Sequence, residues 1–175
     1  MREQPDALTT ARLSLREPRA EDAARIAAFA GDFDVARMTT NIPHPYREAD
    51  AAAYLGRVAA RDRSTHAVFA VELEDEGLIG IVGFHPKAER AVEVGYWLGR
   101  PYWGHGYATE ATRAAVDWAG EDWGKRWVVS GHFADNPASG RVLEKAGFLY
   151  TGVIEPRRSV ARGEDAATRM MVWLA

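Results

Sequence analysis

The sequence predicts an α/β or α+β layered domain, with a mixed, mostly antiparallel sheet of about seven strands and helices on both faces. The hydrophobic period changes along the 175-residue chain from 3.6 to 2 and then alternates, which is typical of mixed helices and strands. The length fits one domain over residues 1–175, and no linker rich in Ser, Gly or Pro divides it. The expected order is β-α-α-β-β-β-α-β-α-β-β, which builds one layered sheet.

The first part of the chain combines one strand with two helices. A short strand is expected around Leu13 and Leu15, which alternate with polar residues. An Ala-rich pattern with acids in its first turn predicts a helix over residues 21–30, and a second helix over about 48–61. The prolines and aspartates of residues 31–46 predict a mostly irregular loop with a short helical turn.

The rest of the chain begins with a period of two. Three strands separated by short polar or Gly/Pro turns are expected to form an antiparallel meander. Two further helices then alternate with three strands. The expected strands are 67–73, 78–84, 91–98, 127–133, 148–154 and 168–174, and the expected helices are 107–122 and 137–146.

Composition excludes several classes of function. With 22 basic and 25 acidic residues the net charge is -3. This disfavours a nucleic-acid partner, because proteins that bind nucleic acids usually carry an excess of basic residues. The absence of cysteine excludes disulfides, thiolate nucleophiles and zinc–thiolate sites, and the five histidines show no metal-ligand spacing, so no metal is expected. With no signal-peptide pattern and no run of about 20 apolar residues, we expect a cytoplasmic protein without a membrane partner.

A glycine-rich turn between a strand and a helix is the sharpest local feature. Gly104 and Gly106 follow the strand that ends near residue 98, and the helix begins at Tyr107. The first amides of a helix lack intrahelical partners and carry partial positive charge, so such a turn can bind phosphate or pyrophosphate. A tight turn without a ligand is the alternative. A Rossmann turn needs a third glycine where Thr109 stands, and the Gly-Lys of a P-loop is absent.

A second group of residues follows the next strand, over 135–148. Asn136 suits a helix N-cap, Pro137 the first helical position and Gly147 the position after the helix end. This structural explanation accounts for those three residues without a ligand. It does not account for Ser139 in the first turn.

Together the two segments resemble the signature regions of the GNAT N-acetyltransferase superfamily, and more closely its RimJ/RimL-like branch of ribosomal-protein N-terminal acetyltransferases. The family pattern [QR]-x-x-G-x-[GA] falls on Trp103-Gly-His-Gly-Tyr-Ala108, with Trp first as in the Y-W-G-x-G-Y-A-x-E-A form of that branch. The pattern N-x-x-[AS]-x-x-[LV]-x-x-[KR]-x-G-F falls on residues 136–148. The resemblance extends from Leu13 to Leu174.

The resemblance implies an acetyl-CoA-dependent N-acetyltransferase that transfers the acetyl group directly to a primary amine of a peptide N-terminus or a small molecule. A catalytically inactive acyl-CoA-binding sensor or interaction module is the alternative, and a monomer or homodimer is the implied assembly. The strand 92–98 would separate from the next strand at a bulge, and pantetheine would lie in the gap. The implied cofactor-binding residues are Tyr96, Trp97, Leu98, Trp103, Gly104, His105, Gly106, Tyr107, Ala108, Thr109, Asn136 and Ser139.

The resemblance also assigns the chemistry. Many relatives use a tyrosine seven positions after Asn136 as general acid, but Leu143 stands there, so Ser139 is the expected donor to the leaving thiolate. A backbone N–H near residues 94–96 would polarise the thioester carbonyl. The general base would be Glu93, with Glu155 as a second candidate and no dedicated base as a third possibility.

The acceptor pocket would include Phe33, His44 and Tyr46, from the irregular loop, and Glu155. Arg157, Arg158 and Arg162 form a basic patch that we expect to be solvated, with an acidic peptide or the CoA 3′-phosphate as alternative partners.

Overall fold

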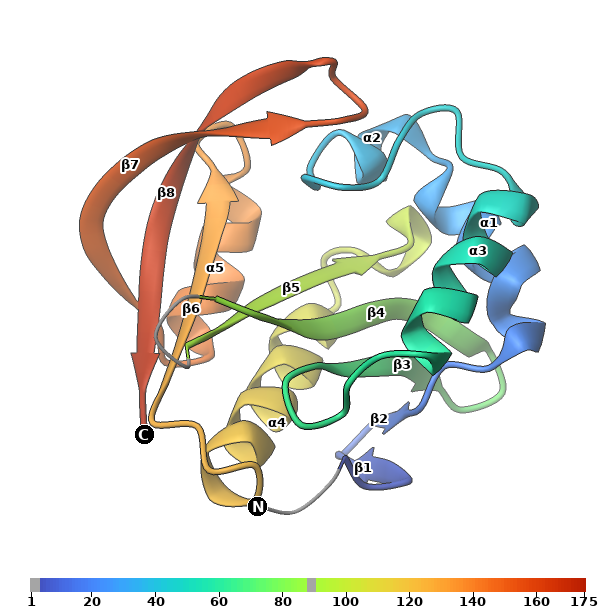
Figure 1. The fold of residues 1–175 in the computed structure, drawn as a ribbon, viewed down its shortest axis with the longest axis horizontal. Helices are drawn as coiled ribbons and strands as arrows, with labels where there is room; N and C mark the ends of the chain where they lie inside the picture. The colour runs from blue at the N-terminus through green and yellow to red at the C-terminus, as the bar shows by residue number, and fades with distance from the viewer. Residues whose placement is uncertain (1–3, 88–90) are drawn as a thin grey trace.

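The computed structural model describes residues 4–87 and 91–175, which form one eight-stranded sheet with helices on both faces (Figure 1). The strand order is β1-β2-β3-β4-β5-β6-β8-β7. The strands are β1 (Ala7–Thr9), β2 (Leu13–Arg16), β3 (Ala67–Leu73), β4 (Gly77–Pro86), β5 (Val92–Leu98), β6 (Trp127–Phe133), β7 (Leu149–Ser159) and β8 (Glu164–Leu174). The helices are α1 (Ala23–Ala30), α2 (Phe33–Ala36), α3 (Glu48–Ala59), α4 (Tyr107–Glu121) and α5 (Pro137–Lys145).

The predicted layered α/β architecture is confirmed, with differences at the margins of the sheet. β1 was not predicted, because its three residues are too few to show a period of two. β7 and β8 extend further toward their shared turn than expected, since their polar ends pair with each other as a ribbon from Glu155↔Thr168 to Ser159↔Glu164. The short helical turn expected in residues 31–46 is α2. The domain expected over 1–175 includes residues 1–3 and 88–90, which lie outside the described residues.

The sheet divides between β5 and β6, its one parallel pair of neighbours within the described ranges. These strands register at only two positions, Val92↔Val128 and Glu93↔Val129, and then separate (Figure 1). The expected bulge is wrong, because β5 pairs with β4 without a register shift from Gly80↔Leu98 to Pro86↔Val92. The separation has another origin. β5 stays paired with β4 and β6 stays paired with β8 over their whole lengths, and both of these pairs are antiparallel. The parallel pair of β5 and β6 is the less stable kind of ladder.

Two apolar cores lie on opposite faces of the sheet. On one face α4 and α5 cover the sheet, and the stacked indoles of Trp118 and Trp123 lie 5.2 Å apart between ring centroids. On the other face α1 and α3 cover β3 and β4. Successive side chains of β5 therefore serve different faces, with Tyr96 packed against the α4–α5 core and Trp97 against the α1–α3 core. Of the helices in the two described ranges, none has the length and apolarity that a membrane crossing requires.

Candidate active site

The glycine-rich turn leads directly into the N-terminus of α4. Gly104 and Gly106 both have φ of 81°, a left-handed conformation that glycine adopts without the cost paid by other residues. A Cβ added at Gly104 would meet no atom within 4 Å, so this turn is open on its outer side. The amides that begin the 15-residue helix at Tyr107 have no intrahelical acceptors. The predicted glycine turn leading into the start of a helix is therefore present in the backbone.

A carboxylate in the first turn of α4 holds this backbone in place. Glu110 accepts hydrogen bonds from Thr10 Oγ1 at 2.7 Å, Arg12 N at 2.9 Å and Arg12 Nε at 2.7 Å. Arg12 also donates to the carbonyl oxygen of His105 at 3.0 Å, which turns that carbonyl toward Arg12. Burial acts to raise the pKa of Glu110, but the hydrogen bonds from Thr10 and Arg12 outweigh it and lower the pKa. The Glu of the Y-A-T-E-A pattern was the available sequence signal, and its anchoring role was not recognised.

A first cavity, of about 350 Å³, lies between the end of β5, the glycine-rich turn and α5; we call it the turn-side cavity. It is lined by Tyr96, Trp97, Leu98, Trp103, Gly104, Gly106, Tyr107, Ala108, Thr109, Asn136 and Ser139, together with Arg141 and Lys145. Of the expected cofactor-binding residues, only His105 is missing from this lining, and its ring stacks on Tyr107 with 5.6 Å between centroids. Arg141 and Lys145, one turn apart on α5, add positive charge that the sequence analysis did not assign.

The open edge of β5 supplies backbone groups to the turn-side cavity. Ser130 Oγ donates to the Val94 carbonyl at 2.9 Å, and Trp103 Nε1 donates to the Leu98 carbonyl at 2.8 Å. Both carbonyls point toward the gap between β5 and β6, and the two-residue period of a strand places the N–H and C=O of Tyr96 on the same edge. The registered β5–β6 pairs end at Glu93. A molecule with amide groups can therefore hydrogen bond to this edge.

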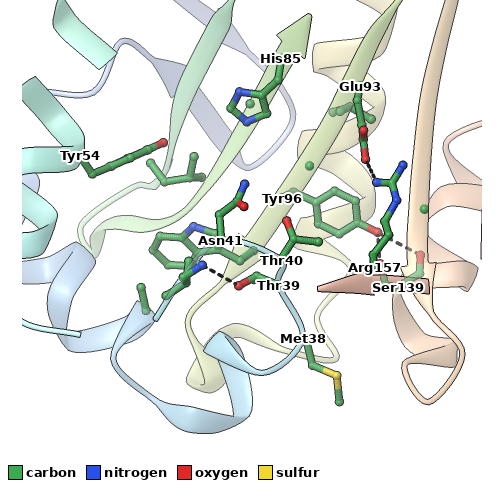
Figure 2. A pocket seen from close by; sticks show the side chains of 18 of the residues that line it. Met38, Thr39, Thr40, Asn41, Tyr54, His85, Glu93, Tyr96, Ser139 and Arg157 are labelled. Atoms are coloured by element: carbon green, nitrogen blue, oxygen red, sulfur yellow. Dashed lines mark hydrogen bonds and ion pairs between the residues drawn. The ribbon is translucent and has the colours of Figure 1, made fainter. Parts of the chain in front are cut away.

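Tyr96 and Ser139 form a hydrogen-bonded pair at the inner end of the turn-side cavity (Figure 2). Their side-chain oxygens are 2.7 Å apart, where either hydroxyl can donate, and the Ser139 carbonyl, 3.0 Å from the Tyr96 hydroxyl, is an alternative acceptor for the phenol proton. Asn136 caps α5, as predicted, because its Oδ1 accepts from the Ser139 amide at 3.3 Å. Burial raises the pKa of Tyr96, so the phenol stays protonated at neutral pH. Leu143 is fully buried in the apolar core, one helical turn beyond Ser139.

A second cavity, of about 650 Å³, lies across β5 on the side of α3; we call it the helix-side cavity. Its floor contains Gly83 and Gly95, which are directly paired between β4 and β5 and leave space where side chains would stand. The two cavities share lining residues, namely Met38, Thr39, Tyr96, Trp97 and Ser139. The Tyr96–Ser139 pair therefore lies where a group held in one cavity can meet a group held in the other.

The two expected bases are bridged by one guanidinium group. Arg157 bonds to Glu93 Oε1 through Nη1 (Figure 2), and to Glu155 Oε1 through Nε at 2.7 Å. The second oxygen of Glu93 lies 2.9 Å from Lys87 Nζ. Glu93 lines the helix-side cavity, whereas Glu155 lines neither cavity.

The basic patch differs from the expected solvated surface. Arg162 pairs with Asp135 at 2.8 Å and donates to the Arg37 carbonyl at 2.6 Å, and Arg157 is held by Glu93 and Glu155. Only Arg158 of the three side chains is exposed to solvent as predicted. The prediction fails because Glu93, Asp135 and the Arg37 carbonyl come from segments distant in sequence, and Glu155, two positions from Arg157, completes its ion pairs.

The loop residues expected at the acceptor pocket divide into two groups. Tyr46 lines the helix-side cavity, while Phe33 and His44 contact each other with 5.1 Å between ring centroids and line neither cavity. The β7–β8 hairpin reaches this loop (Figure 1), where Val160 N donates to the Thr40 carbonyl at 3.1 Å, and Arg157 and Thr168 of the hairpin line the cavity. Residues 38–43 thus form a wall rather than a free surface loop.

The residues 4–87 and 91–175 contain no group of three or more His, Cys, Asp or Glu side chains arranged to hold a metal ion. The site is instead a cradle of backbone amides and a strand edge on one side of β5, joined through Tyr96 and Ser139 to a polar cavity on the other. A transferase that uses an acyl-CoA and an acceptor from opposite sides of one strand has this construction.

Comparison with known proteins gives the family. A family model described as the acetyltransferase (GNAT) domain matches residues 12–149, and the chain belongs to this family. It is an N-acetyltransferase whose co-substrate is acetyl-CoA, and membership does not favour the inactive sensor. The chain is 30% identical over 151 residues to the uncharacterized N-acetyltransferase YoaA of Bacillus subtilis, covering 84% of this chain and 85% of the relative.

Two further likenesses include named acceptors. The ribosomal-protein-serine acetyltransferase of Escherichia coli is 29% identical over 102 residues, which cover 57% of this chain and 56% of that protein. The spermidine N-acetyltransferase of Vibrio cholerae, solved in complex with CoA and spermine, superimposes with a TM-score of 0.78. It is 20% identical, with 94% of this chain and 96% of that chain covered, and this likeness concerns the fold.

Proposed function

We propose that this enzyme acetylates the primary amine of a peptide N-terminus or of a small molecule by direct transfer within a ternary complex, as a member of the RimJ/RimL-like branch. The observation that carries the proposal is the meeting of the two cavities at Tyr96 and Ser139. The chain has no cysteine to form a thioester with the acyl group, which favours direct attack by the amine. We place the reaction in the cytoplasm, with the enzyme as a monomer or homodimer.

The turn-side cavity is proposed to hold acetyl-CoA. The amides of Gly104, Gly106 and the first turn of α4 suit the pyrophosphate, because several donors converge there with the positive end of the helix. Arg141 and Lys145 add charge beside them. The Tyr96 edge of β5 suits the amides of pantetheine, and the Asn136 cap leaves its Nδ2 group as the donor toward the arm.

Ser139 is proposed to stabilise the departing sulfur. Its hydroxyl donates to the thiolate, and Tyr96 holds that hydroxyl at the junction of the cavities through the 2.7 Å contact. The backbone N–H groups of residues 94–96 polarise the thioester carbonyl. Glu93 and Glu155 act in this proposal by fixing Arg157 at the wall of the acceptor cavity, since Arg157 occupies an oxygen of each.

The acceptor is proposed to enter the helix-side cavity, where Tyr46, Tyr54 and Asp50 face it from α3 and the segment before it. The ribosomal-protein serine named for the E. coli relative and the spermidine named for the V. cholerae structure define the first acceptors to test, the former as a peptide that begins with serine.

The test measures free thiol released from acetyl-CoA with a peptide that begins with serine, a peptide that begins with alanine, and spermidine, with mass spectrometry of each product. Turnover of at least one amine is expected. Ser139→Ala is expected to lower kcat about 100-fold while calorimetry shows retained CoA binding. Ser64→Ala, a change at an exposed serine outside both cavities, is the matched control and should leave kcat unchanged. CoA binding without turnover of any amine would contradict the proposal and support the sensor.

A further inference from the structure

One imidazole in the helix-side cavity has no role in the reaction as described so far. His85 lies on β4, directly opposite Glu93 on β5, and its ring points into the cavity (Figure 2). Its Nε2 atom lies 3.7 Å from the position that a Cβ on Gly83 would occupy. Gly83 and Gly95, which are paired between β4 and β5, line the same cavity and leave open space beside the ring.

The other candidate bases in this cavity are already engaged. Glu93 has one oxygen on Arg157 and the other on Lys87. Asp50 accepts from the Arg47 amide at 2.8 Å, where it belongs to the capping box of α3. His132 has Nδ1 2.9 Å from the Phe133 carbonyl and Nε2 3.0 Å from the Tyr150 hydroxyl.

His85 differs from these groups, since its ring nitrogens make no hydrogen bond with any part of the chain that the structure describes. Among the residues that the structure describes, the ring contact of His85 is with His66, at 6.2 Å between centroids. We propose that His85 is the catalytic residue that takes the proton the acceptor amine must lose before it attacks the thioester. This inference rests on the proposed acetyl transfer and names the base for it.

The surroundings of His85 favour the neutral ring that a base requires. Partial removal from water lowers the pKa of His85, the neighbouring His66 lowers it further, and Glu93 acts in the opposite direction. The charged and titratable groups around this part of the cavity are His66, Lys87, Glu93, Arg157 and, on α3, Asp50, Tyr54 and Arg57. The outer edge of His85 is exposed to solvent, which gives the accepted proton a path to water.

The proton and electron balance is complete with His85 and Ser139. An ammonium acceptor first gives one proton to Nε2 of neutral His85, directly or through a water, and its lone pair becomes available. That pair forms the carbon–nitrogen bond, and the pair of the breaking carbon–sulfur bond stays on sulfur. Sulfur gains the Ser139 proton, and the second proton released from nitrogen restores the serine. The products are an amide, a thiol and an imidazolium that returns its proton to solvent.

The test compares His85→Gln with His66→Gln, a matched change at the neighbouring histidine that lies outside both cavities. The amine is whichever member of the serine peptide, alanine peptide and spermidine panel the wild type turns over. His85→Gln is expected to lower kcat/KM about 100-fold near neutral pH, whereas His66→Gln keeps the plateau rate. In the wild type, kcat/KM should fall as the pH decreases through the pKa of His85, and this acidic limb should be absent in His85→Gln.

Two measurements keep the test independent of the stability of a variant. Added imidazole should restore part of the activity of His85→Ala, because it occupies the space of the missing ring. In the wild type, nuclear magnetic resonance should show His85 titrating below the ordinary histidine pKa of 6.5. A His85→Gln enzyme within threefold of wild type, or a His85 ring that stays charged where the wild type is active, overturns the inference alone. A wild type that turns over none of the three amines overturns the proposed acetyl transfer, and the inference with it.

Discussion

The two cavities that meet at β5 are built from different kinds of groups. The turn-side cavity is formed mainly by two short segments, residues 96–109 and 136–145. Its polar groups are backbone amides, the edge of β5 and the side chains of Arg141 and Lys145. The helix-side cavity draws side chains from α1, α3, the following strands and the 38–43 segment, and it contains most of the ionisable groups of the site. In the proposed reaction, binding in the turn-side cavity therefore depends on backbone conformation, while chemistry in the helix-side cavity depends on protonation.

The sharpest way to break this contrast is to change backbone conformation on one side only. Gly104→Ala places a Cβ on a residue with φ of 81°, at a cost of about 1–2 kcal/mol. Gly152→Ala in β7 has the same φ and the same open surroundings, so it is the matched control. Both variants should lose similar stability in thermal unfolding, but only Gly104→Ala should weaken acetyl-CoA binding, about tenfold by calorimetry. Equal affinities in the two variants would show that the turn does not bind the co-substrate.

A smaller effect is expected at the junction of the cavities. Tyr96→Phe removes the hydroxyl that contacts Ser139 and keeps the ring. The kcat should fall about fivefold, which corresponds to the loss of one hydrogen bond of about 1 kcal/mol. The KM for acetyl-CoA should stay near the wild-type value, because the backbone edge of residue 96 is unchanged. In a double-mutant cycle with Ser139→Ala the two losses should not add. Additive losses would mean that Tyr96 acts independently of Ser139.

The smallest effect concerns the anchor of the turn. Glu110→Gln is expected to raise the KM for acetyl-CoA about threefold and to leave the KM for the amine unchanged, since it weakens the bonds to Thr10 and Arg12. The folded pKa of Glu110 lies below its ordinary value, so its contribution to stability is present above the unfolded pKa and is lost as the pH falls through the folded pKa. Between neutral and acid pH, the free energy of unfolding should therefore decrease more in the wild type than in Glu110→Gln, which lacks this carboxylate. Denaturant unfolding at several pH values measures the difference.

The same contrast explains how much could be predicted from the sequence. Gly104, Gly106 and the Asn136 cap are local features, because a left-handed turn or a helix cap needs only its own few residues, and the predicted turn and cap are present. The pairing of Arg157 with Glu93 could not be predicted in this way, since the two residues are 64 positions apart and meet only in the folded sheet.

The sequence analysis gave His85 no role beyond the absence of metal-ligand spacing among the histidines. Its place in the cavity depends on strand register, which the local sequence does not show. Its position opposite Glu93, and the neighbouring Gly83↔Gly95 pair, exist only when β4 and β5 are aligned without a bulge. The bulge itself was implied by resemblance, and no residue pattern in the chain required it. Glu93 and Glu155 were each predicted as a base without regard to their partners. The Arg157 guanidinium that bridges them occupies one carboxylate oxygen of each and so changes their role.

The early end of the β5–β6 ladder has a thermodynamic consequence. β5 is paired with β4 and β6 is paired with β8, but β5 and β6 pair with each other at only two positions. Beyond these positions, a strand edge without a ladder partner lies inside the sheet rather than at its margin. An edge of this kind favours the addition of another extended, amide-containing chain. In the proposed complex, a pantetheine arm bound along it would act as a short supplementary strand across the seam. Folding and co-substrate binding would then be linked equilibria, and the melting temperature of the enzyme is expected to rise with the concentration of acetyl-CoA.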